Sequence, residues 1–94
     1  MQTPKTVLIT GGSRGIGAAT ARALAADGWD VAISYRSREA EAARVVADCQ
    51  AFGRRAVAFQ TEVAVEAEVH RLFAEVGATL GPLGAFVNNA GVVT

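Results

Sequence analysis

The sequence predicts an α/β fold, a Rossmann-type doubly wound parallel sheet of which this chain forms the first half. Short β-branched runs alternate with helical patterns, and a glycine-rich loop joins the first run to the first helix. Strands connected through helices run parallel, and right-handed crossovers leave few topologies. We therefore expect β-α-β-α-β-α-β, with strand order 3-2-1-4, and assign residues 1–94 to one part of a single domain.

Four short runs rich in Val, Ile, Ala and Phe are the expected strands. They lie at 6–10, 31–35, 56–59 and 85–88. The first is apolar along its whole length rather than alternating, which indicates a strand covered on both faces.

Helices are expected at about 18–27, 38–52 and 65–80. The first places Thr20, Ala23 and Leu24 on one face of a helix that can lie close to a sheet. Ser37 is the expected N-cap of the second. The third has apolar residues at steps of three and four, namely Val65, Val69, Leu72, Phe73, Val76 and Leu80.

Composition excludes several classes of protein. The chain is 51% hydrophobic, and its nine basic residues balance nine acidic ones, so disorder, nucleic-acid binding and membrane-surface binding are not expected. No apolar run approaches the roughly 20 residues of a membrane helix. Cys49 is the single cysteine, and we expect it to be a small apolar residue packed on a helix. His70 is the single histidine, and no second metal ligand lies near it in the sequence. We expect a cytoplasmic protein and no metal. Arg54-Arg55 reads as a solvated turn.

The loop at 11–17 combines four glycines with a position between a strand and a helix. Glycine permits backbone angles that a Cβ would penalise. The following helix N-terminus offers unpaired N–H groups and partial positive charge to a phosphate. A glycine-rich turn without a ligand is the alternative.

Two motifs carry a family resemblance. The octapeptide at 10–17, TGGSRGIG, resembles the T-G-x-x-x-G-x-G signature of short-chain dehydrogenases/reductases, and the segment at 88–91, NNAG, matches that family's second signature. The resemblance covers essentially the whole chain. It implies a Rossmann-type fold, a nicotinamide cofactor and carbonyl/alcohol redox chemistry.

The resemblance also implies roles for individual residues. Glu62 stands where the family commonly has an aspartate beside the adenine, and it is one methylene longer. Asn89 either lines the site or holds neighbouring strands together. The residues implied in cofactor binding are Gly11, Ser13, Arg14, Gly15, Ile16, Gly17, Tyr35, Arg36, Ser37, Glu62, Val63, Asn88, Ala90 and Gly91.

The end of the second strand distinguishes the two nicotinamide cofactors. NAD sites place a carboxylate there to bind the ribose hydroxyls, but this chain has Tyr35 followed by Arg36. A guanidinium binds a 2′-phosphate with paired charge-assisted hydrogen bonds, and Arg14 can face the same phosphate. The residues therefore favour NADP(H). The alternative is that Arg36 and Arg38 are ordinary solvated charges, although a cation opposes the dipole at a helix start.

We interpret the chain as part of an oxidoreductase that transfers a hydride between NADP(H) and a small carbonyl or alcohol. A non-catalytic NADP(H) sensor of the same fold, or a small structural domain, is the alternative. Family members act through a serine and Tyr-x-x-x-Lys, whereas the only tyrosine and lysine here are Tyr35 and Lys5. No catalytic residue is therefore assigned. We expect this segment to be inactive alone, the catalytic remainder to lie beyond Thr94, and the complete protein to be a homo-oligomer.

Overall fold

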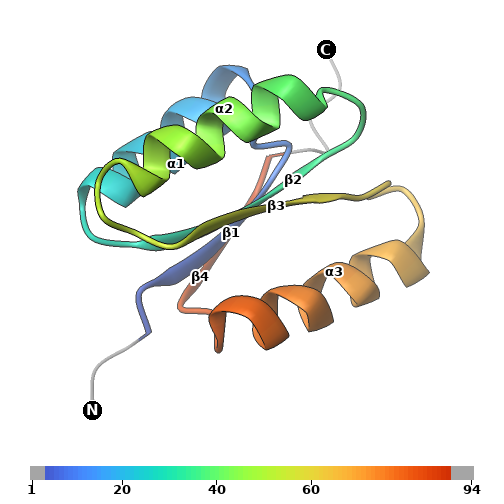
Figure 1. The fold of residues 1–94 in the computed structure, drawn as a ribbon. Helices are drawn as coiled ribbons and strands as arrows, with labels where there is room; N and C mark the ends of the chain where they lie inside the picture. The colour runs from blue at the N-terminus through green and yellow to red at the C-terminus, as the bar shows by residue number, and fades with distance from the viewer. Residues whose placement is uncertain (1–3, 90–94) are drawn as a thin grey trace.

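The computed structural model of the chain describes residues 4–89, which form one parallel sheet between two layers of helices (Figure 1). The elements in chain order are β1 (Thr6–Thr10), α1 (Gly15–Ala26), β2 (Asp30–Tyr35), α2 (Glu39–Gln50), β3 (Ala56–Gln60), α3 (Glu66–Leu80) and β4 (Ala85–Asn88).

The sheet confirms the expected topology. Its strand order is β3-β2-β1-β4, and every pairing is parallel. Leu8 of β1 aligns with Ala32 of β2 and with Phe86 of β4. Helices α1 and α2 cover one face of the sheet and α3 covers the other (Figure 1). All strands therefore end at the same edge of the sheet, where the connecting loops gather.

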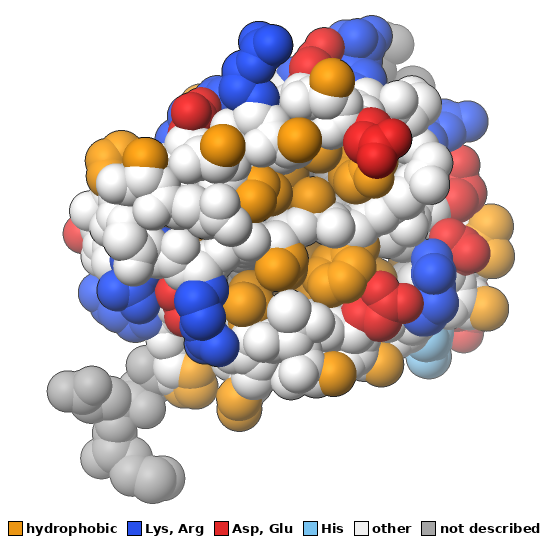
Figure 2. Space-filling model, in the orientation of Figure 1, with side chains coloured by type: hydrophobic (Ala, Val, Ile, Leu, Met, Phe, Trp, Pro, Cys, Tyr) orange, Lys and Arg blue, Asp and Glu red, His pale blue; other side chains and the backbone are white. Residues whose placement is uncertain are grey.

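Two apolar clusters lie on opposite faces of the sheet. Val7 and Ile9 point toward α1 and α2, while Leu8 between them points toward α3, as the alternation of a strand requires. Figure 2 shows the apolar side chains in two bands, one on each side of the sheet edge. Because β1 is buried along its whole length, its side chains contribute to both clusters.

The buried face of α1 differs from the predicted one. Gly17, Ala18, Ala21 and Ala25 are buried, whereas Ala23, expected on the packed face, is exposed. The smallest side chains face the sheet because they let the helix axis approach it closely, and the larger Thr20 and Leu24 are displaced to the margin, half-buried.

Ser37 is not the N-cap of α2, contrary to the prediction. The cap position is Arg38, and no side chain caps the helix there. Glu39 and Glu41 occupy the first turn, where a carboxylate interacts favourably with the helix dipole. Arg38 forms an ion pair with Glu41 at 3.2 Å. The helix ends at Gln50, two residues earlier than expected.

Only part of the predicted apolar stripe of α3 is buried. Leu72, Val76 and Leu80 pack on the sheet, but 47% of Val65 and 37% of Phe73 is exposed. Phe73 contacts Phe86 of β4 edge-on, with ring centroids 5.2 Å apart, and 46% of Phe86 is exposed. The buried residues of α3 are therefore limited to Leu72, Val76 and Leu80.

Arg54 and Arg55 are not simply solvated, contrary to the prediction, because both bind Asp30 at the start of β2. The Arg55 backbone N–H and Nε donate to the two carboxylate oxygens, each at 3.0 Å, and Arg54 Nη2 lies 3.1 Å from Oδ1. Burial of Asp30 acts to raise the pKa of its carboxyl. The hydrogen bonds from Arg55 and the charges of Arg55 and Arg54 outweigh it, so this pKa is lowered.

This network predicts a pH dependence of stability. A lowered native-state pKa contributes stability that is present above the unfolded value of about 3.9 and is lost as pH falls through the native value. Asp30→Asn should lower the free energy of unfolding at pH 7 by about 1–3 kcal/mol, and the difference from wild type should shrink in acid. Urea denaturation between pH 7 and pH 2.5 measures it. Asp48→Asn, which breaks an exposed pair with Arg22, is the control, with an effect below about 1 kcal/mol. A pH-independent difference for Asp30→Asn would contradict this account.

Candidate functional site

One cavity of about 650 Å³ opens beside the carboxyl ends of β1, β2 and β3. This size suits a small-molecule ligand, and this edge is where open α/β sheets bind ligands. Its lining comes from the β1–α1 loop, the end of β2 with the loop that follows, and the β3–α3 loop. The lining residues are Gly11, Ser13, Arg14, Ser34, Tyr35, Arg36, Ser37, Arg38, Thr61, Glu62, Val63 and Ala64.

Glycines shape the β1–α1 loop in two distinct ways. Gly11 and Gly15 have φ of 68° and 61°, a region that L-residues rarely adopt. Gly17 is buried in the first turn of α1, and a Cβ there would overlap the Gly11 carbonyl and the Asn89 side chain. The last glycine therefore permits close packing of α1 against the loop.

Two side chains from neighbouring strands hold the loop in place. Ser34 at the end of β2 accepts the Gly11 N–H with its Oγ at 3.3 Å and the Gly12 N–H with its carbonyl at 3.0 Å. Asn89 donates from Nδ2 to the Gly11 carbonyl at 3.0 Å, and its own N–H donates to the Thr10 hydroxyl. These contacts confirm that Asn89 joins neighbouring strands, and its other predicted role, in lining the site, stays a prediction.

The N-terminus of α1 is free of acidic side chains. Neither a side-chain cap nor an acidic residue in the first turn is present, whereas α2 and α3 each have two glutamates there. The unpaired N–H groups and the positive end of the helix dipole therefore remain available to an anionic ligand.

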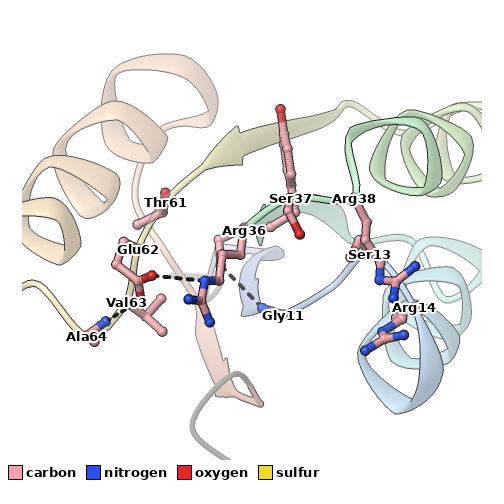
Figure 3. A pocket seen from close by; sticks show the side chains of 12 residues that line it. Gly11, Ser13, Arg14, Arg36, Ser37, Arg38, Thr61, Glu62, Val63 and Ala64 are labelled. Carbon is pink, nitrogen blue, oxygen red and sulfur yellow. Dashed lines mark hydrogen bonds and ion pairs between the residues drawn. The ribbon is translucent and has the colours of Figure 1, made fainter.

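Arginines dominate the charge of the cavity. Arg14, Arg36 and Arg38 line it together with a single carboxylate, Glu62. Figure 3 shows Arg14, Arg38 and Ser13 close together on one side and Thr61 to Ala64 on the other, with Arg36 reaching toward Glu62. Among residues 4–89, Arg14 forms no ion pair. The site therefore favours a ligand with several negative charges.

Glu62 is fixed from two directions. Its Oε2 lies 3.0 Å from Arg36 Nε, and its Oε1 accepts the Ala64 N–H at 3.1 Å. The neighbouring Thr61 is buried, and its hydroxyl has no hydrogen-bond partner within the described part of the chain.

The predicted site residues fall into three groups. Gly11, Ser13, Arg14, Tyr35, Arg36, Ser37, Glu62 and Val63 line the cavity together. Gly15 lines a smaller neighbouring hollow, 78% of Ile16 is exposed, Gly17 lies behind the loop, and Asn88 contacts the Thr10 hydroxyl at 3.1 Å. Ala90 and Gly91 lie outside the described residues. The roles of all of these in ligand binding stay predictions.

Sequence reasoning missed Ser34 and Arg38. Ser34 is a small polar residue in an otherwise apolar strand, a pattern that indicates a hydrogen bond at a buried position. Arg38 stands at a helix start, where its charge opposes the dipole, and this unfavourable placement is the signal that indicates a role other than solvation.

The described residues show no complete acid–base machinery of the kind that the resemblance implies. Tyr35 lies at the carboxyl end of β2, and Lys5 precedes β1, where its Nζ donates to the Asp27 carbonyl at the opposite end of the sheet. Between residues 4 and 89, no group of three or more His, Cys, Asp or Glu could hold a metal ion. None of the helices described is long and apolar enough to span a membrane.

Comparison with known proteins places this geometry in a family. The sequence model described as short chain dehydrogenase matches residues 5–94. A 3-oxoacyl-[acyl-carrier-protein] reductase, FabG, of Staphylococcus aureus (strain N315) is 40% identical over 92 residues, covering 98% of this chain and 37% of the relative.

Solved structures agree in fold and sequence. A short chain dehydrogenase from Burkholderia cenocepacia J2315 in complex with NADP superposes with a TM-score of 0.91 at 47% identity, covering 99% of this chain and 38% of that one. A blue fluorescent protein from a metagenomic library, in complex with NADPH, gives 0.90 at 44% identity, covering 96% and 37%. The chain thus spans a little over a third of the length of these proteins.

The close approach at Gly17 yields a stability prediction. Gly17→Ala should lower the free energy of unfolding by about 1–3 kcal/mol, because the added methyl group overlaps the loop. Gly77→Ala in α3 is the matched control, since a Cβ there meets nothing within 4 Å and the change should stabilise the helix by up to about 1 kcal/mol. Urea denaturation of both variants tests the packing, and equal stabilisation by the two changes would refute it.

Proposed function

The chain belongs to the short-chain dehydrogenase family, and on this premise we propose that residues 1–94 are the N-terminal, cofactor-binding part of a single Rossmann-type domain in an NADP(H)-dependent oxidoreductase. The complete protein would transfer a hydride between NADP(H) and a small carbonyl or alcohol. The choice of cofactor rests on one observation. Arg14 and Arg36 line the same cavity, and no acidic residue directly follows β2.

The residues present fit the phosphates of NADP(H). A Cβ at Gly15 would meet nothing within 4 Å, so the backbone at the start of α1 is open and a diphosphate would approach it without side chains in the way. Arg14 and Arg36 would hold the 2′-phosphate, and Val63 would contact the adenine. The cofactor, when bound, supplies the hydride; the chain supplies binding and orientation. The NADP and NADPH complexes of the similar structures support the proposal.

A non-catalytic NADP(H)-binding sensor of the same fold is the second candidate. It is favoured by the separation of Tyr35 and Lys5 at opposite ends of the sheet, which excludes these two from acting as a proton-donating pair. A serine and Tyr-x-x-x-Lys in the complete protein would favour the enzyme over the sensor.

We propose that the protein is located in the cytoplasm, since a free, buried Cys49 fits a reducing compartment. Homo-oligomers are proposed from the exposed Phe73 and Phe86.

The cofactor preference can be tested by a charge reversal. Wild type should bind NADPH more tightly than NADH. Arg36→Asp should weaken NADPH binding by about 1.5–3 kcal/mol, since it removes a charge-assisted phosphate contact, which is roughly a tenfold to 150-fold rise in Kd. Fluorescence titration of both cofactors measures it. Lys5→Asp, the same charge change at the opposite end of the sheet, should alter neither Kd. Equal wild-type affinity for the two cofactors would refute the assignment.

The 94-residue chain alone should show no carbonyl-dependent oxidation of NADPH. Hydride transfer to a carbonyl needs a proton donor beside the oxygen, and the only tyrosine stands in the arginine-lined cavity that we assign to the adenosine end. Absorbance at the reduced-nicotinamide band, with a panel of ketones and aldehydes, provides the assay. Turnover that Tyr35→Phe abolishes would overturn the prediction.

A further inference from the structure

We propose that Glu62 is a positioning residue that orients Arg36 toward a 2′-phosphate and thereby sets how strongly the chain distinguishes NADP(H) from NAD(H). The inference deepens the proposed function and rests on it. It concerns the one carboxylate among the arginines of the cavity, which at first sight should weaken the binding of a phosphate.

The ion pair with Glu62 leaves the terminal nitrogens of the Arg36 guanidinium free. Glu62 Oε2 forms its ion pair with Arg36 through Nε, at 3.0 Å. Within residues 4–89, no other residue pairs with this guanidinium. The terminal nitrogens can therefore still donate two parallel hydrogen bonds to a phosphate while Glu62 stays in place.

Arg36 needs such a support because its side chain is 81% exposed. A free arginine at the surface samples many rotamers and loses that freedom when it binds. The Arg36 backbone is anchored, since its carbonyl accepts a hydrogen bond from Gln60 at 3.1 Å. Glu62 is the contact that restricts the remainder of the side chain.

Glu62 can act as a support because it is itself held. Its Oε1 accepts the Ala64 N–H, and its backbone N–H donates to Glu68 of α3 at 3.2 Å. Glu68 in turn forms an ion pair with Arg71 at 3.0 Å. The support of Arg36 therefore extends from the end of β2, through the β3–α3 loop, to the first turns of α3.

The electrostatic balance still favours an anion. Paired together, Glu62 and Arg36 contribute little net charge, and Arg14 and Arg38 line the same cavity. Arg38 shares its charge with Glu41, whereas Arg14 has no acidic partner among the residues described. The carboxylate is thus neutralised locally, and the cavity keeps an excess of positive charge.

A double-mutant cycle tests the coupling. Dissociation constants of 2′,5′-ADP and 5′-AMP, which differ in the 2′-phosphate, are measured on the protein that carries this chain, for wild type, Glu62→Ala, Arg36→Ala and the double variant. We expect Glu62→Ala to reduce the preference for 2′,5′-ADP by about threefold or more, as for coupled neighbours, and to leave it unchanged in the Arg36→Ala background. Using the ratio cancels any contact of Glu62 with the adenine.

Two further variants sharpen the test. Glu62→Gln keeps the size of the side chain but removes its charge, and it replaces one of the two oxygens that contact Arg36 and the Ala64 N–H by an amide nitrogen; the preference should fall here too. If circular dichroism shows that Glu62→Ala is unfolded, the result for Glu62→Gln tests the role of Glu62 instead. Glu66→Ala removes a carboxylate that is 90% exposed and outside the cavity, and it should leave the ratio at the wild-type value.

The outcomes separate this inference from the proposed function. A wild-type protein without preference for 2′,5′-ADP would refute the assignment of NADP(H) itself. A wild-type preference that Glu62→Ala leaves unchanged or increases would overturn only the role of Glu62, and an increase would show that Glu62 competes with the phosphate. An equal reduction with and without Arg36 would overturn it as well.

Discussion

The structure depends on the burial of β1 between two neighbouring strands and two helix layers. Every residue of β1 is buried, and the strand pairs with β2 on one side and β4 on the other. A five-residue strand covered in this way has one direction and one register. The glycine loop that follows β1 therefore has a defined position. Ser34 and Asn89 form hydrogen bonds with Gly11 there, and they lie at or just past the ends of the neighbouring strands.

Small residues fix the position of α1 relative to the sheet. The helix packs through Gly17, Ala18, Ala21 and Ala25, so its first turn lies directly against the loop that precedes it. The absence of side chains that brings α1 close to the loop also leaves the N–H groups of its first turn uncovered. The same feature makes Gly17 intolerant of a methyl group.

The carboxylates are distributed unevenly over the structure. Most of them pair with cations or helix N-termini away from the glycine loop. Asp30 forms ion pairs with Arg54 and Arg55 at the amino end of the sheet, and glutamates occupy the first turns of α2 and α3. No acidic residue does the same for α1 or for Arg14 within the part of the chain that the structure describes. Of the arginines that line the cavity, Arg14 is thus the one without an acidic partner among the described residues.

Local patterns in the sequence predict the strand order, the glycine loop and most of the cavity lining, though not Ser34 or Arg38: apolar runs, glycine spacing and the residues after each strand indicate them. Only the tertiary structure decided the rest. Which face of α1 is buried depends on how closely the helix can approach the sheet. Arg54 and Arg55 acquire their partner Asp30, and Arg36 acquires Glu62, only when β2 and β3 lie side by side. Pairings across a sheet join residues about 25 positions apart, and no period in the sequence records them.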